Sequence, residues 1–335
     1  MHNGARVRID RNTVARRARA AGRWLAYGAV ALNVAAFLAA WALTHFTPRS
    51  ARFRMLSAIG TVSLPRPENA RRPDFGLPWE PHTFEGAHDA SLEAWHVPAE
   101  PSRGLVVLFH GYADSKARLF PAAREFLRLG WSVLLVDFNG SGGSEGSATS
   151  VGFHEAVDVA AALSYARGLE PRRPVVLYGA SMGAAAILGA AARHSIEPEA
   201  LILECPFDNL LATVSHRFEQ RHLAAAPLAH LVLFWGGVQH GFNPFRHNPA
   251  AYAKSVTVPA LLMAADGDPY VTLNETRAIF AGLAGPKLLR TCSASRHVVC
   301  LSADAEQWRR AVGELLQLAA PNVPATNDRR LLAAG

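Results

Sequence analysis

The sequence predicts a mostly parallel α/β sheet with helices on both faces, preceded by an apolar segment long enough to cross a membrane. From residue 83 onward, continuously apolar runs of strand length alternate with segments of helical period. This pattern is typical of parallel sheets that are buried on both sides. Near the N-terminus, residues 25–43 contain no charged side chain. With 335 residues, half of them apolar, the chain is long enough for one large domain and a further segment.

Residues 25–46 are predicted to form a transmembrane anchor. As a helix, the uncharged stretch 25–43 would be about 28 Å long, which is close to the thickness of the hydrocarbon core of a bilayer. Seven arginines precede it, so we expect residues 1–24 to be a basic cytoplasmic segment and the body to lie on the far, periplasmic or extracytoplasmic side. The alternative is a signal peptide cleaved near Ala42, where an Ala-Trp-Ala sequence ends, followed by secretion.

The positive charge of the chain is confined to its N-terminal part. The formal net charge is +7, yet residues 1–54 contain ten arginines and one acidic residue, so the remainder is slightly acidic. We therefore predict no nucleic-acid partner. Residues 47–82 contain six prolines and are predicted to be a linker to a domain over 83–320, which a tail over 321–335 follows.

Seven strands and five helices are predicted between residues 92 and 319. In chain order the strands are 92–97, 104–110, 131–138, 174–180, 200–206, 259–265 and 287–293, and the helices are 115–129, 151–167, 182–194, 273–284 and 302–319. Residues 208–257 interrupt the alternation and are rich in large apolar side chains, so we expect a small helical lid over an acyl pocket. An insertion that serves stability alone is the alternative. Site residues are expected at the carboxyl ends of the strands.

A Gly179-Ala-Ser181-Met182-Gly183 motif links the strand at 174–180 to the helix that follows. It matches the G-x-S-x-G nucleophile elbow. The serine of an elbow occupies a strained turn, where bulky side chains two positions away on either side would clash, which explains the glycines. The Met182 N–H would lie at the helix N-terminus, where the dipole favours negative charge. A turn of small residues without a catalytic role would have the same pattern.

Two later strand ends supply the partners that a nucleophilic serine needs. Asp266 and Asp268 follow the next-to-last strand, and His297 follows the last one. The order Ser, Asp, His along the chain is the order expected for a nucleophile elbow. A lone histidine is more often a surface or core residue, so the prediction depends on the three strand ends meeting at one edge of the sheet.

The remaining strand ends and loops do not point to a cofactor. At His110 and Gly111, a sharp turn would let the N–H of Tyr112 point into the cleft. The glycine-rich loop 137–146 has neither of the common nucleotide-binding patterns, so we predict no cofactor. The histidines within 208–257 lack the spacing of zinc ligands, so we predict no metal.

Several other polar residues are predicted to have structural roles. Glu155 and Asp158 lie on a predicted helix, where a solvated face or hydrogen bonds at the helix start would explain them. Glu204 ends a strand and could support neighbouring site residues. Three cysteines make no disulfide framework, although Cys292 and Cys300 could pair if the domain is exported.

These stretches resemble the α/β-hydrolase superfamily, and its monoacylglycerol-lipase and serine-aminopeptidase-like branch in particular. The similarity covers about residues 83–319. It is carried by LFHGYADS (108–115), VDFNGSGGSEG (136–146), YGASMG (178–183), ECPF (204–207), DPYV (268–271) and His297. The chain departs from the family pattern at Asn139, where arginine is usual, and at Ala265 and Ala294, where glycine is frequent.

The resemblance implies an eight-stranded sheet and a catalytic triad. In such a triad Ser181 attacks an acyl carbonyl, His297 takes the proton and later delivers it to the leaving group, and Asp268 orients the imidazole. Asp268 is preferred over Asp266 because the D-x-x-V spacing that ends at Val271 resembles the acid loop of the family.

The predicted activity is that of a membrane-bound serine hydrolase. The backbone N–H groups of Tyr112 and Met182 would form its oxyanion hole. The substrate would be a small molecule with a moderately apolar acyl group, joined by a carboxylic ester or a thioester bond. The alternatives are a serine peptidase or an acyltransferase that uses the same triad, and a non-catalytic interaction module at the membrane.

Overall fold

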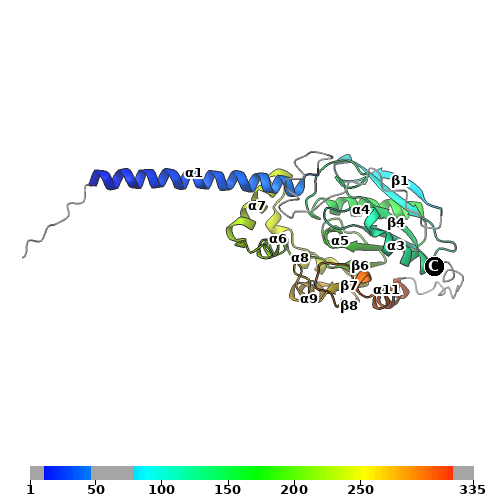
Figure 1. The fold of residues 1–335 in the computed structure, drawn as a ribbon. Coiled ribbons are helices and arrows are strands. Elements are labelled where there is room, and N and C mark those ends of the chain that lie inside the picture. The colour runs from blue at the N-terminus through cyan, green and yellow to red at the C-terminus, as the bar shows by residue number, and fades with distance from the viewer. Residues whose placement is uncertain (1–10, 47–77, 320–335) are drawn as a thin grey trace, which may run out of the picture.

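The computed structural model describes residues 11–46 and 78–319 of the chain. The first ten residues, most of the predicted linker and the predicted tail over 321–335 lie outside this part. A single sheet forms the centre of the described body, and a long N-terminal helix projects from one end of it (Figure 1).

The sheet has eight strands in the order β1-β2-β4-β3-β5-β6-β7-β8. Strands β3 to β8 are parallel, and β2 runs antiparallel to both of its neighbours. The bounds are β1 Glu80–Glu85, β2 Ser91–Val97, β3 Leu105–Phe109, β4 Ser132–Val136, β5 Val175–Ala180, β6 Ala200–Glu204, β7 Ala260–Ala265 and β8 Lys287–Cys292. All seven predicted strands are present, and the carboxyl ends of the parallel strands meet at one edge.

Helices cover both faces of the sheet, as predicted. Their bounds are α1 Arg11–Thr44, α3 Phe120–Arg128, α4 Glu155–Leu169, α5 Met182–Arg193, α6 Leu210–Glu219, α7 Ala225–His240, α8 Pro249–Tyr252, α9 Leu273–Gly282, α10 Cys300–Ala303 and α11 Ala305–Ala319, with 3-10 turns at η1 Ala87–Asp89, η2 Lys116–Leu119, η3 Pro244–Arg246 and η4 Ala253–Ser255. Phe126 of α3 and Trp308 of α11 pack on one face. Val159 of α4, Ile187 of α5 and Ile279 of α9 pack on the other.

The sheet begins earlier than the sequence predicts. β1 lies partly inside the segment 47–82 that was assigned to the linker. Its half-buried residues His82 and Phe84 alternate with exposed ones, and the Phe84 ring stacks on Tyr165 of α4 with centroids 4.6 Å apart. Because β1 is an edge strand that contains Pro81, it lacks the continuous apolar run that identified the inner strands.

The insertion between β6 and β7 is helical and packs on the body. It contains α6, α7, η3, α8 and η4. Leu210 of α6 and Leu233 of α7 form a small buried cluster with Ala185 of α5 and with Val271, which follows β7.

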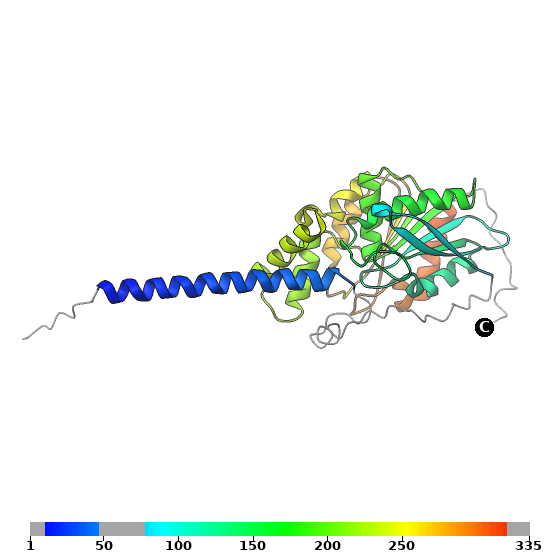
Figure 2. The same cartoon turned by 90° about the horizontal axis from the view of Figure 1, so that it is seen from above.

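The N-terminal helix α1 has the length and composition of a membrane span. Residues Ala15–Thr44 of this helix are apolar enough to cross a bilayer, and a signal sequence would meet the same test. Most of its side chains are exposed, yet Ala36 and Ala40 are buried against α7. Both views of the molecule show α1 extending away from the body beyond this contact (Figures 1 and 2).

Candidate active site

Ser181 occupies a strained turn between β5 and α5. Its backbone has φ +52° and ψ −110°, a conformation that costs a non-glycine residue about 1–3 kcal/mol. A Cβ atom on Gly179 would lie 2.5 Å from the Ala184 nitrogen, and one on Gly183 would lie 2.5 Å from the Phe109 carbonyl oxygen. The clash predicted from the sequence therefore exists at both positions, and the glycines let the chain turn tightly enough to hold Ser181 at the sheet edge.

Ser181, His297 and Asp268 form a chain of hydrogen bonds. The Nε2 atom of His297 lies 2.7 Å from the Ser181 Oγ, and its Nδ1 atom lies 2.5 Å from the Asp268 Oδ2. The other carboxylate oxygen of Asp268 accepts hydrogen bonds from the backbone N–H groups of Tyr270 (2.8 Å) and Val271 (3.1 Å). Residues from the ends of three strands thus meet at one point, and the orientation of the carboxylate is set by its own loop.

Asp266 has different partners. Its carboxylate accepts hydrogen bonds from the Ser293 hydroxyl and the Ala294 N–H, both at 3.1 Å. It therefore connects the loop after β7 to the loop after β8. Of the two aspartates considered from the sequence, Asp268 is the one hydrogen-bonded to His297.

The two residues predicted to supply oxyanion donors lie beside Ser181. Met182 is the first residue of α5, where the backbone N–H groups have no partner within the helix. Gly111, which precedes Tyr112, lies next to the elbow, because a Cβ atom placed on Gly111 would lie 3.7 Å from the Ser181 Cβ. Two backbone segments thus flank the serine, one from α5 and one from the loop after β3.

The end of α1 contacts Tyr112. The Tyr112 hydroxyl donates a hydrogen bond to the Leu43 carbonyl, and its ring lies 6.1 Å from the ring of Phe46. Burial raises the pKa of Tyr112 to about 12, so the hydroxyl stays protonated and remains a donor. The N-terminal helix therefore reaches a residue of the candidate site, a contact that the sequence did not predict.

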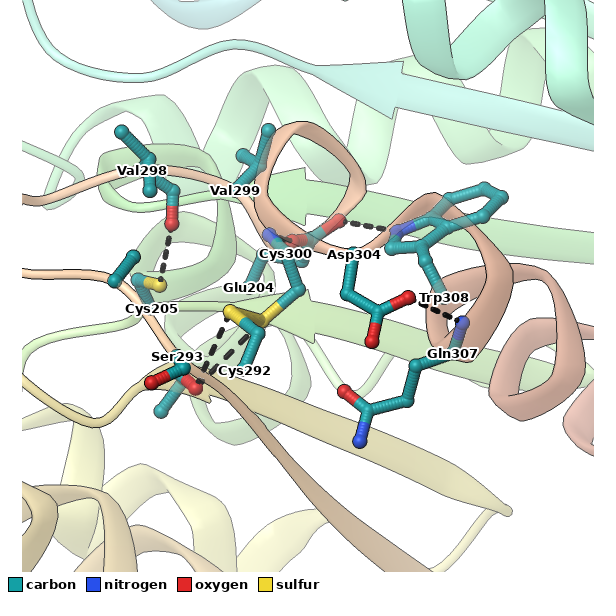
Figure 3. The surroundings of a disulfide bond; sticks show 12 residues. Glu204, Cys205, Cys292, Ser293, Val298, Val299, Cys300, Asp304, Gln307 and Trp308 are labelled. Carbon is teal, nitrogen blue, oxygen red and sulfur yellow. Dashed lines mark hydrogen bonds between the residues drawn. A yellow bond between two sulfur atoms is a disulfide. The ribbon is translucent and has the colours of Figure 1, made fainter.

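Glu204, the last residue of β6, is fully buried next to the site. Its Oε1 accepts hydrogen bonds from the Tyr178 hydroxyl (2.8 Å) and the Trp308 indole (2.7 Å), and its Oε2 accepts one from the Cys300 N–H (2.6 Å; Figure 3). Burial raises the pKa of Glu204. Because Cys300 lies three residues after His297, this carboxyl group supports the loop that carries the histidine.

A disulfide bond closes the same loop. Cys292, at the end of β8, is bonded to Cys300, and the two Cα atoms lie 5.6 Å apart (Figure 3). The third cysteine, Cys205, is a buried free thiol. The bond joins the two ends of the segment that contains His297, so both the disulfide and Glu204 restrain that segment.

The glycine-rich loop 137–146 encloses a buried ion pair. The Lys116 ammonium contacts the carboxylates of Asp137 and Glu93, and the Gly143 N–H donates to Asp137 at 2.8 Å. These glycines let the backbone approach a carboxylate of the protein itself. The rarity of lysine, with three in the chain, was the sequence signal that could have singled out Lys116.

Two acidic residues of α4 are buried, so the solvated-face interpretation was wrong for them. Glu155 accepts hydrogen bonds from the Ser150 N–H (3.0 Å) and the Gly152 N–H (2.9 Å), as expected for bonds at a helix start. Asp158 accepts from the N–H groups of Ala87 (2.7 Å) and Asn139 (3.0 Å). Both hold surrounding loops in place.

Helix α6 of the insertion contacts the loop that carries Asp268. The His216 Nδ1 atom lies 3.1 Å from the Tyr270 carbonyl oxygen, and the Arg217 guanidinium lies 4.8 Å from the centre of the Tyr270 ring. That ring in turn lies 6.1 Å from the His297 ring. The insertion therefore borders the candidate site. Across residues 11–46 and 78–319, no cluster of His, Cys, Asp and Glu is arranged to hold a metal ion.

Comparison with known proteins agrees with this architecture. A family model described as serine aminopeptidase, S33, matches residues 100–238. A solved esterase from Pyrococcus furiosus has a similar fold, with a TM-score of 0.62 at 23% identity, over 73% of this chain and 92% of that one. The chain has the α/β-hydrolase fold, and its residues 100–238 are similar to the serine aminopeptidase family.

Further proteins are similar over smaller parts of the chain or at lower identity. The Bacillus subtilis protein YqkD is 26% identical over 233 residues, which is 69% of this chain and 76% of its own length. A monoacylglycerol lipase from Mycolicibacterium smegmatis is 31% identical over 132 residues, which is 38% of this chain and 47% of its own length. The structure of Est1E from Butyrivibrio proteoclasticus with ferulic acid bound has a TM-score of 0.56 at 18% identity, over 70% of this chain and 97% of that one. The resemblance and the fold class predicted from the sequence are thus confirmed.

Proposed function

We propose that this chain is a membrane-anchored serine hydrolase that cleaves carboxylic esters through an acyl-enzyme intermediate. The observation that carries the proposal is the pair of short contacts from His297, at 2.7 Å to the Ser181 Oγ and at 2.5 Å to Asp268. Similarity to esterases and to a lipase makes an ester the favoured acyl compound.

In the first step, the Ser181 Oγ attacks the carbonyl carbon of the ester while His297 Nε2 takes the hydroxyl proton. Asp268 keeps the Nδ1 proton of His297 on the far side of the ring and stabilises the imidazolium that forms. The N–H groups of Met182 and Tyr112 donate to the developing oxyanion, and the loss of one such donor typically costs about 3 kcal/mol.

The tetrahedral intermediate then collapses. His297 gives its proton to the alkoxide leaving group, and the acyl group stays on Ser181 as an ester. A water molecule, deprotonated by His297, attacks this acyl-enzyme, and the resulting intermediate releases the carboxylic acid and restores the serine. We propose that the insertion over 208–257 acts as the lid of the acyl pocket, because α6 borders the loop of Asp268 and α7 contributes large apolar side chains.

The proposed topology places the N-terminus in the cytoplasm and the body on the far side of the membrane. The excess of arginine before the uncharged stretch 25–43 supports this orientation, and so does the Cys292–Cys300 disulfide, since disulfides persist in oxidising compartments. A reporter fused after residue 335 tests it, and a cytoplasmic signal would refute it. Intact mass of the mature protein distinguishes the anchor from a signal peptide cleaved near Ala42.

Labelling with a fluorophosphonate probe tests the catalytic proposal. We expect the wild-type chain to be labelled, and Ser181→Ala to give no signal although it folds normally. Equal labelling of both proteins would refute the assignment of the nucleophile. A panel of chromogenic esters of increasing acyl length then tests the substrate class. Probe labelling without turnover of any ester would favour the peptidase or acyltransferase alternative, and turnover of thioesters alone would replace the oxygen ester.

A further inference from the structure

We propose that helix α7 of the insertion is embedded in the lipid bilayer beside α1, in the leaflet next to the folded body. The inference goes beyond ester hydrolysis and rests only on the part of the proposed function that makes α1 a membrane-spanning helix. The partner of this surface is the hydrocarbon region of the membrane.

The first step concerns the length of α1 that a membrane span requires. A bilayer core about 30 Å thick needs about 20 apolar residues. The helix offers 20 uncharged residues, 24–43, because four arginines occur between Arg16 and Arg23. If the span ended at residue 32, only nine of these residues, about 14 Å of helix, would remain. The whole stretch up to Leu43 must therefore lie in the bilayer if α1 crosses it.

The second step is that α7 packs on this same stretch. Ala36 and Ala40 of α1 form a buried cluster with Val232 of α7. A Cβ atom placed on Gly236 of α7 would lie 4.0 Å from the Ala40 Cβ. Small residues at such a crossing are typical of helix pairs within membranes, because they let the two backbones approach closely. The contact zone lies inside the residues that α1 needs for its span, so α7 has to share the bilayer.

The third step concerns the polar groups in the contact zone. The Trp235 indole donates a hydrogen bond to the Asn33 side chain (3.2 Å), whose amide group donates to the Ala29 carbonyl (2.9 Å). The Gln239 amide donates to the Phe37 carbonyl (2.9 Å). The N–H donors of these side chains bond within the protein and need no water, as a bilayer core requires of polar groups inside it. Among the described residues, the buried Oε1 of Gln239 has no hydrogen-bond partner. Asn33 lies ten residues, about 15 Å, before Leu43, so these bonds reach well into one leaflet.

The outer face of α7 is mostly apolar, with one exposed polar residue, His230, a helical turn before Phe234. No Asp, Glu, Lys or Arg occurs between Arg221 and Arg246. Phe234 and Val238, one helical turn apart, are 50% and 56% exposed. Such exposure would be costly in water, whereas in lipid these side chains are surrounded by hydrocarbon. The body would then rest on the membrane surface, with its lid inserted.

Site-specific labelling tests this arrangement in the full chain. Cys205 is buried and the other two cysteines are bonded, so a cysteine introduced at the surface can be labelled selectively. We would place a nitrobenzoxadiazole label at Phe234→Cys and reconstitute the protein in phosphatidylcholine vesicles with and without doxyl-labelled lipid. Leu38→Cys, exposed on α1, reports on the span, and Glu306→Cys, exposed on α11, reports on water.

We expect the labels at 234 and 38 to show blue-shifted emission and at least twofold quenching by doxyl lipid, and the label at 306 to show neither. Quenching at 38 with water-like emission at 234 would overturn the embedding of α7 and leave the anchor intact. Water-like emission at both positions would overturn the anchor and the inference together. Probe labelling of Ser181 is measured separately, so a failure of the hydrolase proposal has its own readout.

A cross-link tests the helix contact directly. Two cysteines at positions whose Cβ atoms lie about 4 Å apart can form a disulfide. The double variant Ala40→Cys, Gly236→Cys should therefore link α1 to α7 when the protein in vesicles is treated with a thiol oxidant. Leu38→Cys with Gly236→Cys is the matched control, because Leu38 is exposed. Mass spectrometry should find the joined peptides in the first pair at several times the yield of the second. Equal yields would contradict the packing on which the inference depends.

Discussion

Replacing Asp268 by asparagine should abolish most of the activity through the tautomer of His297. The two backbone donors on the Asp268 Oδ1, from Tyr270 and Val271, require an acceptor at that position. The asparagine must therefore place its oxygen there and its NH2 group opposite His297 Nδ1. The reverse orientation would oppose the NH2 group to two N–H groups, each unpaired donor costing about 1–3 kcal/mol.

An NH2 group beside Nδ1 makes that nitrogen the acceptor, so the imidazole proton moves to Nε2. The Nε2 atom then donates to Ser181 and can no longer remove its proton. A wrong tautomer of this kind costs about ten-thousand-fold in kcat, which corresponds to about 5 kcal/mol of transition-state stabilisation. Folding should change little, because asparagine has nearly the same shape and keeps both backbone hydrogen bonds.

The assay is kcat/KM for a short-chain p-nitrophenyl ester with the full chain in detergent, alongside thermal unfolding of each variant. Asp266→Asn is the matched control, since Asp266 contacts Ser293 and Ala294 and not His297. We expect it to retain activity within tenfold. The reasoning fails if Asp268→Asn keeps more than a tenth of the wild-type activity, or if both variants lose the same amount.

Three further predictions concern the side chains of Glu204, Tyr112 and Asp158. Glu204→Gln should lower the free energy of unfolding by about 1–3 kcal/mol, measured by thermal or chemical unfolding, because its NH2 group would leave the Cys300 N–H unpaired; an unchanged midpoint would contradict this. Tyr112→Phe removes the hydrogen bond to the Leu43 carbonyl and should lower kcat/KM about two- to tenfold, while a saturating dose of the fluorophosphonate probe should still label the variant fully. An unaltered kcat/KM would show that this contact does not position Tyr112. Burial raises the pKa of Asp158 to about 7, so between about pH 4 and pH 7 the folded chain binds a proton that the unfolded chain has lost, and the free energy of unfolding should fall as the pH rises through this range. Asp158→Asn should flatten this pH dependence in unfolding experiments, and a slope equal to that of the wild type would refute the assignment.

The parts of the fold that the sequence predicted correctly are those encoded by local patterns. The inner strands are apolar throughout, so their positions could be located to within a few residues. The elbow is equally local, because Gly179 and Gly183 are needed by the turn that holds Ser181. The rule that parallel strands end at one edge made Asp266, Asp268 and His297 candidates, and the resemblance of the D-x-x-V spacing to the acid loop of the family favoured Asp268. In the structure Asp268 lies within hydrogen-bond distance of His297.

The parts that escaped prediction join distant segments. The donors to Glu204 come from residues 26 to 104 positions away, and the Tyr112 hydroxyl bonds to a carbonyl 69 positions away. No period or spacing in the sequence encodes such contacts, since each depends on the tertiary packing of whole elements. The strand β1 escaped for a different reason, because one of its faces is exposed and a proline interrupts it.

The contact between α1 and α7 also bears on whether the N-terminal helix is removed. Cleavage near Ala42 would take away Ala36 and Ala40 and leave Val232 and its neighbours on α7 uncovered. A secreted form would then present to water an apolar helix with no charged residue between Arg221 and Arg246, a surface that promotes aggregation. In the uncleaved chain α1 covers one side of the same helix, and in the proposed arrangement lipid would cover the other. On the proposed topology, retention of α1 would explain why the insertion can be so apolar. A mature protein that has lost its first 42 residues by mass and yet stays soluble and monomeric would contradict both proposals.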